Sequence, residues 1–428
     1  MSDIQKIPPA FFQGRPVLGF TASHSVGGGT ATISLPTGSP SFSSPRWDTP
    51  PEGRELSLTW GGREVYKGYV GSIQRTAMHG TSKLEVTMKP LINKLSEEGG
   101  VATTTIRGPA ALQSKPATSE KNLSPSVLLD VGNYMEGDNF AEWILRVANY
   151  ISNSDVSTIL IPGKAYPKYK IKETLIDTVF HQCCNRDSIQ DTPLSYIQSL
   201  IGSVALNFVS RPSFQGKFLL HPVLPMMKTP FLTIGPSDYI SVTDNTAGSI
   251  FPTINICVSR YTGSNEKDMR HQDSNALLSF KDIVDMNVLF HTYPDTGDGI
   301  YWYAERSPMF GSMTSLKKVD TDALGDASAQ LTWGAMAYQG RSINIAIPWS
   351  RYFSLAENVG NIIAVNLPSG FGESKVYGLL NSANITVRRE PGEGNSTAQA
   401  VIGITHVRGE AENGHAFDEH PLFSSNEE

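Results

Sequence analysis

One short segment of the chain places several metal-binding or nucleophilic side chains together, at His181, Cys183 and Cys184, and Cys257 is the only other cysteine. Zinc needs four converging ligands, usually supplied through a two-residue gap as in CxxC, and adjacent cysteines rarely close on one tetrahedral ion. Three thiols are also one short of the four that hold an iron–sulfur cluster. The segment is therefore interpreted as a helix end with small, packed side chains, and neither a metal nor a cofactor is expected.

The nine histidines are scattered along the chain, and none forms an HExxH pair on a helix. No GxSxG turn is present to expose a nucleophilic serine. A Ser-His-Asp triad can still assemble from distant segments, because triads are defined in space and not in sequence. Since no local signature supports one, no catalytic residue is assigned and the chain is not expected to be an enzyme.

Three further segments have one chemical and one structural interpretation each. The glycines of Val26–Gly29 lack the Lys-Ser/Thr of a phosphate-binding loop, which favours a turn. Tyr293–Gly299 resembles a calcium loop but lacks the closing Glu, so a hairpin turn between two aromatic strands is favoured. Tyr301–Tyr303 has the aromatic rings to stack on sugars or bases, yet aromatic residues are also ordinary strand formers.

Composition limits the class of protein that positions these residues. The 428 residues have a net charge of −6 and only 18% charged side chains, so no cationic character is available for gripping nucleic acid or an anionic membrane. Glycine and proline, at 38 and 27 residues, favour a turn-rich and strand-rich protein. The start lacks the features of a secretory signal, and no run of about 18 apolar residues occurs, so a soluble protein made in a reducing compartment is expected.

Residues 1–90 are expected to form an antiparallel β-domain, with a surface loop at 36–51 that is rich in proline and serine. The turn at 60–64 contains a Gly-Gly pair, which tight hairpins favour because glycine adopts positive φ. Polar and apolar residues alternate at 83–88, as in a strand with one buried face. The strands predicted in this domain are 17–24, 29–35, 54–60, 64–74 and 83–88.

Residues 91–137 are expected to form an extended connection, apart from one helical turn at 91–95, and residues 138–234 a mixed α/β domain. Apolar residues recur at helical spacing from 138 to 151, from 172 to 184 and, most clearly, from 192 to 204. The third pattern begins with Thr192-Pro193, which supplies a cap and a proline in the first turn. Two strands, 205–209 and 216–222, are expected to follow it as a hairpin.

Residues 235–409 return to strand patterns and are expected to form a second β-domain that one helix interrupts, at 320–338. The strands predicted there are 255–260, 300–305, 341–348, 362–367, 377–388 and 398–408. The last segment, 410–428, is polar and acidic and is expected to be a flexible tail or to order only against a partner. The chain is thus predicted to be mainly β with an α+β middle section, in which two small antiparallel β-barrel-like domains flank a mixed helical domain.

Several of these segments together resemble the tail hub, or baseplate hub, proteins of long-tailed bacteriophages, which are related in fold to the base of the type VI secretion spike. The similarity lies in the hairpin at 62–70 and the strand at 83–87, then in the helix at 192–204 with the strands around Phe208 and 216–222. It continues in the helix to Tyr338 with the strands at 341–348 and 359–365, where Gly360-Asn361 stands in place of the commoner Gly-Asp.

The resemblance implies a structural protein of the virion tail tip, assembled in the bacterial host cytoplasm. It implies a homotrimer whose paired β-domains form a pseudo-hexameric ring between a sixfold tail tube and a threefold central spike or fibre. Implied partners are the tail tube or a distal tail protein, the spike or fibre, and the tape measure protein. DNA would pass through the lumen during ejection without sequence-specific binding, which a net charge of −6 suits.

Two other functions are compatible with the sequence. A tail-associated cell-wall hydrolase or endopeptidase could be built on a hub-like scaffold, and it would need paired carboxylates or a histidine-based site. A carbohydrate-binding or receptor-binding tail protein would use Tyr301–Tyr303 and Trp349 as its stacking surface. Activity on peptidoglycan would favour the first, and glycan binding that is lost on changing Trp302 would favour the second.

Overall fold

The computed structural model describes residues 7–36, 55–78, 81–97, 105–107, 128–130, 155–161, 169–171, 192–202, 204–246, 253–259, 288–293, 300–303, 321–389 and 396–425, with isolated positions between 141 and 152. These residues are mainly β, as the sequence predicts. Several predicted features lie outside them: the loop at 36–51 beyond Pro36, most of the connection at 91–137, and the helix at 172–184.

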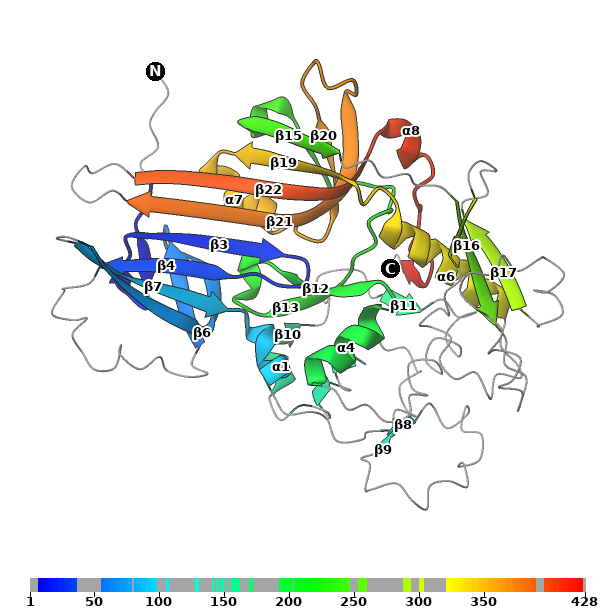
Figure 1. Ribbon diagram of the computed structural model, residues 1–428, viewed down its shortest axis with the longest axis horizontal. Coiled ribbons are helices and arrows are strands. Elements are labelled where there is room, and N and C mark those ends of the chain that lie inside the picture. The colour runs from blue at the N-terminus through cyan, green and yellow to red at the C-terminus, as the bar shows by residue number, and fades with distance from the viewer. Residues whose placement is uncertain are drawn as a thin grey trace.

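Thirteen strands form one large sheet, which combines strands from the first 90 residues with strands from residues 232–408 (Figure 1). The first group of strands is β1 (Ala10–Phe12), β2 (Arg15–Pro16), β3 (Gly19–Ser25), β4 (Ala31–Pro36), β5 (Glu55–Trp60), β6 (Arg63–Met78) and β7 (Thr81–Lys89). The second group is β14 (Leu232–Ile234), β15 (Ser241–Thr246), β19 (Arg341–Ile347), β20 (Ile362–Asn366), β21 (Lys375–Arg389) and β22 (Ser396–Arg408).

Most of the smaller elements lie below and to the right of this sheet in Figure 1. The short helices and 3-10 turns are η2 (Leu91–Asn93), α1 (Lys94–Glu97), η5 (Val156–Thr158), α4 (Pro193–Gly202), η7 (Pro212–Phe214), η8 (Pro236–Asp238), α6 (Thr321–Met336), η10 (Trp349–Arg351), α7 (Tyr352–Ala356) and α8 (Glu410–Asn413). The short strands are β8 (Thr105–Arg107), β9 (Leu128–Asp130), β10 (Leu160–Ile161), β11 (Tyr169–Ile171), β12 (Leu206–Ser210), β13 (Phe218–Pro222), β16 (Thr253–Ser259), β17 (Val288–Tyr293), β18 (Ile300–Tyr303) and β23 (Phe423–Ser425).

Local sequence explains why the long strands form. In β5 the alternate residues Leu56, Leu58 and Trp60 are buried while those between them are half-exposed, so one face of the strand packs on the core. The turn after β5 places Gly61 at φ 58° and Gly62 at φ 77°, which glycine adopts without a steric penalty. The predicted hairpin at 60–64 is confirmed.

One pairing joins the two groups of strands into a single sheet. Strand β3 pairs antiparallel with β21 over seven residue pairs, from Gly19 opposite Arg388 to Ser25 opposite Ser382. Figure 1 shows the blue β3 and β4 directly beside the orange β21 and β22. Buried side chains of both groups, such as Ile33 and Ile345, belong to one continuous hydrophobic core.

The two groups repeat the same arrangement of strands. In the first group the order across the sheet is β3-β4-β7-β6-β5, and in the second it is β15-β19-β22-β21-β20. Each begins with two paired strands and continues with three more, the last of which pairs back onto the second strand. The sequence suggests only that a β-domain occurs toward each end of the chain. The strand order shows that these two parts form an internal structural repeat.

The register of the strands confirms that the repeat holds residue by residue. Each long strand has a bulged residue at the same rung of the ladder, Gly71 in β6 and Asn381 in β21, besides one further register shift in each strand. Three positions before each bulge stands a glycine whose Cβ would meet a paired backbone oxygen: Gly68 against Lys89 O at 2.3 Å and Gly378 against Thr405 O at 2.8 Å. Positions 63–78 of β6 therefore correspond to about 373–388 around β21, with a shift that both bulges fix.

The middle of the chain contains several of the predicted elements. Helix α4 confirms the helix predicted at 192–204, with Thr192 Oγ1 accepting a hydrogen bond from Ser195 N at 3.3 Å and Ile197 and Ile201 buried. Strands β12 and β13 confirm the antiparallel hairpin that follows it. Within the helix predicted at 138–151, the described positions are helical, and Ala141, Ile144 and Ala148 are buried. Helix α6 confirms the helix predicted at 320–338.

Barrel closure, which the sequence suggests for both β-domains, is not present among the described strands. The path of the large sheet ends at β15 on one side and at β2 on the other, and no described pair joins these ends. The two β-domains are also continuous with each other through β3 and β21. Alternating residues predict that a strand has a buried face, but they do not identify the neighbouring strand. The pairing of β3 with β21 therefore cannot be predicted from this pattern.

A second difference concerns the aromatic strands near 300. The sequence favours a hairpin turn at Tyr293–Gly299 between two aromatic strands, but in the structure β16 lies between β17 and β18, the strands on either side of this segment. Strand β17 pairs antiparallel with one edge of β16, and β18 pairs parallel with the other edge. Because either arrangement gives the same alternation of residues, the sequence does not distinguish them.

A third difference concerns the segment after Gly409, which the sequence predicts to be a flexible acidic tail. It contains α8, and β23 pairs with β11, with Phe423 opposite Ile171. Phe417, Leu422 and Phe423 are buried, and the backbone N of Phe417 donates to Met226 O at 2.8 Å. Apolar residues between the acidic ones give this segment enough hydrophobic surface to pack against the fold.

Candidate functional site

The cysteine-rich segment does not assemble into a described site. His181, Cys183 and Cys184 lie outside the described residues, and Cys257 lies on β16, opposite Phe290 of β17. Within the described part of the chain, no group of three His, Cys, Asp or Glu side chains is arranged to hold a metal ion. The interpretation of Cys183 and Cys184 as packed side chains stays a prediction.

One histidine and one serine that are far apart in the sequence do come together. His24 Nδ1 lies 2.8 Å from Ser210 Oγ, and His24 Nε2 lies 2.7 Å from Val65 O. Because a carbonyl only accepts, Nε2 carries the proton, and the serine hydroxyl then donates to Nδ1. Both side chains are buried, and desolvation lowers the pKa of His24 to about 4. The pair therefore fastens β3 to β6 and β12 and offers no accessible nucleophile.

A second buried histidine belongs to a polar cluster beneath α7. His221 Nε2 lies 3.0 Å from Asn361 Oδ1, and Arg211 Nε donates to Val359 O at 2.9 Å. Burial, together with the positive charge of Arg211, lowers the pKa of His221 to about 3. Burial also lowers the pKa of Arg211, to about 10. These groups connect β12 and β13 to the turn before β20, and they are enclosed rather than open to a substrate.

The glycine-rich turn and the aromatic residues that the sequence offers as candidate sites have different outcomes. The predicted turn at Val26–Gly29 is confirmed between β3 and β4, with Gly27 at φ 84°. Tyr301–Tyr303 lies in β18, and its use as a stacking surface stays untested. Trp349 is half-buried and makes a T-shaped contact with Trp60 at a centroid distance of 5.3 Å. Its use as a stacking surface for sugar also stays a prediction.

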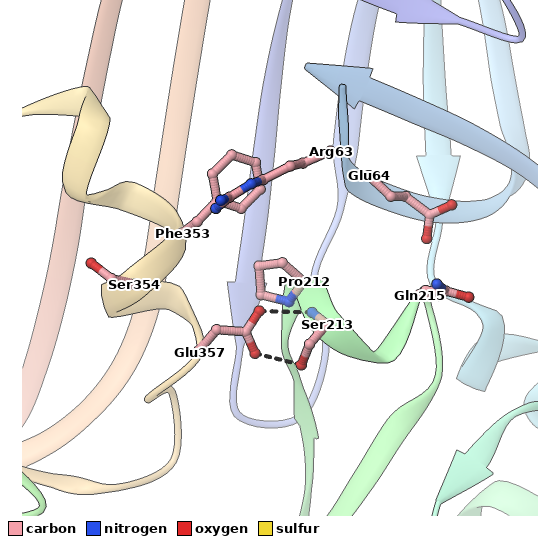
Figure 2. Close-up of a pocket in the computed structure, with 8 residues that line it drawn as sticks. All are labelled: Arg63, Glu64, Pro212, Ser213, Gln215, Phe353, Ser354 and Glu357. Carbon is pink, nitrogen blue, oxygen red and sulfur yellow. Dashed lines mark hydrogen bonds between the residues drawn. The ribbon is translucent and has the colours of Figure 1, made fainter. Parts of the chain in front are cut away.

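A shallow hollow of about 380 Å³ lies where β6, η7 and α7 meet (Figure 2). Glu357, just after α7, holds η7 there, accepting from Ser213 N at 2.8 Å and from Ser213 Oγ at 2.5 Å. The guanidinium of Arg63 lies 5.3 Å from the centre of the Phe353 ring. The charged groups of the hollow are thus engaged with the protein itself. This arrangement suits a junction between β6, η7 and α7 better than a ligand pocket.

The free sheet edges are a second kind of candidate site, one for interaction instead of chemistry. Strand β15 pairs with β19 on one side, and no described strand covers its other side. The second half of β6, after the bulge at Gly71, pairs with β7, and no described strand covers its other edge either. Unpaired N–H and C=O groups along such edges are a template for another strand.

Strand β15 is not predicted from the sequence, because its residues Ser-Val-Thr-Asp-Asn-Thr are almost all polar and do not alternate between polar and apolar. One correspondence is visible in the sequence. Leu35-Pro36 ends β4, while Ile347 ends β19 and Pro348 follows it, and Leu35 and Ile347 occupy the same rung of their repeats. This relates β19 to β4 but does not locate β15, because β15 ends at Thr246, far before Arg341, whereas β3 comes shortly before β4.

Among the described residues, no helix is both long and apolar enough to cross a membrane. No protein-family model matches the sequence, and no curated protein is significantly similar to it.

Two solved structures share the fold over almost the whole chain. One is a tail protein from Neisseria meningitidis, with a TM-score of 0.50, 10% sequence identity, and coverage of 93% of this chain and 96% of that one. The other is the 43 kDa tail protein of prophage MuSo2 from Shewanella oneidensis, with a TM-score of 0.51, 10% identity, and coverage of 98% and 99%. At this identity the likeness shows a common fold.

Proposed function

We propose that the chain is a structural subunit of a phage tail tip or a related injection device. Three copies form a hub that joins a sixfold tail tube to a threefold central spike or fibre, with a channel for DNA at its centre. In this proposal the chain acts by assembly and has no catalytic role. The shared fold with two tail proteins supports the proposal.

The observation that carries the proposal is the internal repeat. Segments 1–90 and 235–409 each supply the same order of strands to one sheet, and we propose that they are the two tube-type domains, with 138–234 as the domain between them. A chain with two equivalent domains can contact a sixfold ring with only three copies, because each copy presents two similar surfaces. The same trimer keeps a true threefold axis for a spike or fibre.

Charge is consistent with this role. A weakly acidic chain, with a net charge of −6, offers no general attraction that would hold DNA in the channel. The partners proposed for the hub are the tail tube or a distal tail protein on one side, the spike or fibre on the other, and the tape measure protein inside the tube. Its location is then the tip of the virion tail, after assembly in the host cytoplasm.

Two measurements test the proposal. Light scattering of the purified protein should give a mass three times the 46.6 kDa of one chain. Electron microscopy of tail particles labelled beyond Glu428 should then place the label on the tail axis at the tip. A stable monomer, or a label away from the axis, would contradict the hub.

A further inference from the structure

The pairing of β3 with β21, the internal joint, connects the two repeats within one chain. Strand β3 is the first strand of its repeat, and its outer edge pairs with β21 after the bulge at Asn381. Ala22 lies opposite Ile385 and Thr21 opposite Thr386. The first strand of one repeat therefore completes the long strand of the other.

The same two surfaces exist a second time in the chain without a described partner. Strand β15 corresponds to β3, because Thr243 faces Asn344 of β19 just as Thr21 faces Thr32 of β4. Residues 72–78 of β6 correspond to 382–388 of β21, because each segment follows the bulge at the same rung. One repeat thus offers a first strand, and the other offers a long strand that can receive it.

Exposure at two positions agrees with this correspondence. Ile240, just before β15, is 71% exposed, whereas its equivalent Leu18 is only half-exposed beside β21. Both residues donate a backbone hydrogen bond to the equivalent strand, Leu18 N to Ser34 O at 2.8 Å and Ile240 N to Ala346 O at 2.7 Å. On the receiving side, Arg75 is exposed where Ile385 is buried. At these two positions the side chain is more exposed in the segment that has no described neighbouring strand.

We propose that β15 of one copy of the chain pairs antiparallel with residues 73–78 of β6 in a second copy. The register copies that of the internal joint, so that Thr243 lies opposite Thr76 and Asp244 lies opposite Arg75 of the partner copy. This inference rests on the trimeric hub proposed above and specifies the surfaces that build it. The two edges are different, so the contact is head-to-tail and closes a ring.

The side chains at this contact complement one another. In the internal joint Thr21 Oγ1 and Thr386 Oγ1 lie 3.2 Å apart, and the proposed register places Thr243 and Thr76 as the matching pair. Asp244 and Glu373 both contact Arg341, at 2.7 and 2.9 Å, which leaves two carboxylates around one guanidinium. Arg75 of the second copy adds the second positive charge and balances this group.

A cross-link across the proposed contact tests the register. The variant Thr76→Cys/Thr243→Cys is made in a background in which Cys183, Cys184 and Cys257 are replaced by Ser. Residues directly opposite in antiparallel strands are about 4.5–5.5 Å apart between Cα atoms, which lies within the range that a disulfide spans. Under mild oxidation the purified protein should form covalent dimers and trimers, with the trimer as the largest species on a non-reducing gel.

Three controls accompany the cross-link. Thr21→Cys/Thr386→Cys places the same two substitutions at the internal joint and should give an intrachain disulfide that leaves the protein at monomer mass. Thr76→Cys/Asn245→Cys shifts the register by two residues on the same strand face and should cross-link poorly. A mixture of the two single variants, Thr76→Cys and Thr243→Cys, should stop at dimers, because each chain then carries only one reactive edge.

The outcomes separate this inference from the proposed function. A trimer by light scattering that cross-links at Thr76 and Thr243 supports both. A trimer that does not cross-link there, while Thr21→Cys/Thr386→Cys closes normally, overturns the edge pairing and leaves the hub standing. Preferential cross-linking of the shifted pair overturns the register. A protein that stays monomeric and uncross-linked overturns both.

Discussion

At the scale of residues, several buried polar groups among the described residues hold segments of the chain together. His24, Ser210 and Val65 come from three strands and satisfy one another's hydrogen bonds in a buried space. Arg408 does the same near the C-terminal segment, donating to Pro225 O at 2.8 Å and to Asn413 Oδ1 at 2.9 Å. Buried polar groups with complete partners specify how strands dock, and removing one partner leaves the other unsatisfied.

Burial of His24 makes the stability of the fold depend on pH. Its pKa is lowered to about 4 because the charged form is desolvated, so the unfolded chain binds the proton first as the solution is acidified. The stabilisation is complete above the ordinary pKa of histidine, near 6.5, and is lost as the pH falls toward about 4. Across this window the contribution is roughly 3 kcal/mol.

The variant His24→Gln measures that contribution. Its free energy of unfolding by denaturant should be lower than that of the native protein at pH 7, because a buried hydrogen-bonded ring is replaced. The difference between the two proteins should shrink at pH 4.5, since glutamine does not titrate. A difference that stays the same at both pH values would mean that His24 is protonated at pH 4.5 as readily in the folded protein as in the unfolded chain.

The two equivalent glycines give a second prediction at this scale. Gly68→Ala would bring a Cβ to 2.3 Å from Lys89 O, and Gly378→Ala to 2.8 Å from Thr405 O. Each substitution should destabilise the fold by about 1–3 kcal/mol, because a paired backbone has little room to move. Gly202→Ala is the control, since no other atom lies within 4 Å of its added Cβ. Equal stability of all three variants in denaturant would contradict the close approach.

At the scale of elements, the sequence predicts the strands that have one dry face and one wet face. Alternation identifies β5, β7 and β19, and helical spacing identifies α4 and α6. The same method misses β15, which is polar on both faces because it lies at an open edge of the sheet. The candidate edge site thus consists partly of a strand whose pattern carries no signal of burial.

The segment after Gly409 is predicted to be flexible because it is rich in acidic residues, but it contains an ordered helix and strand. Phe423 of β23 is 1% exposed, whereas Phe231 before β14 is 64% exposed. Phe423→Ala should lower the free energy of unfolding by about 3–5 kcal/mol, because it empties a filled part of the core. Phe231→Ala removes the same atoms from a wetter site and should cost much less. Equal losses for the two variants would indicate that the segment after Gly409 does not pack as described.

At the scale of the whole molecule, pairing between the two ends of the chain is the feature that the sequence could not supply. The pairing of β3 with β21 connects residues that are more than 350 positions apart in the sequence. Neither strand has a residue pattern that identifies the other as its partner. Once the pairing is known, the repeated strand order explains both the filled edge inside the chain and the open edges outside it. In the proposed ring, the same kind of contact serves folding inside one chain and assembly between chains.

Assembly through these edges links the stability of the protein to its concentration. Because only folded chains form the ring, association stabilises the folded state, and the apparent Tm should rise by several degrees over about a hundredfold increase in protein concentration. Arg75→Glu places a carboxylate opposite Asp244 of the partner copy, beside Glu373, and should flatten this dependence. Lys228→Glu makes the same charge change at the surface pair with Asp418, 3.0 Å away, and should preserve it. A native Tm that does not change with concentration, or equal slopes for the two variants, would exclude these edges as the contacts that hold the ring together.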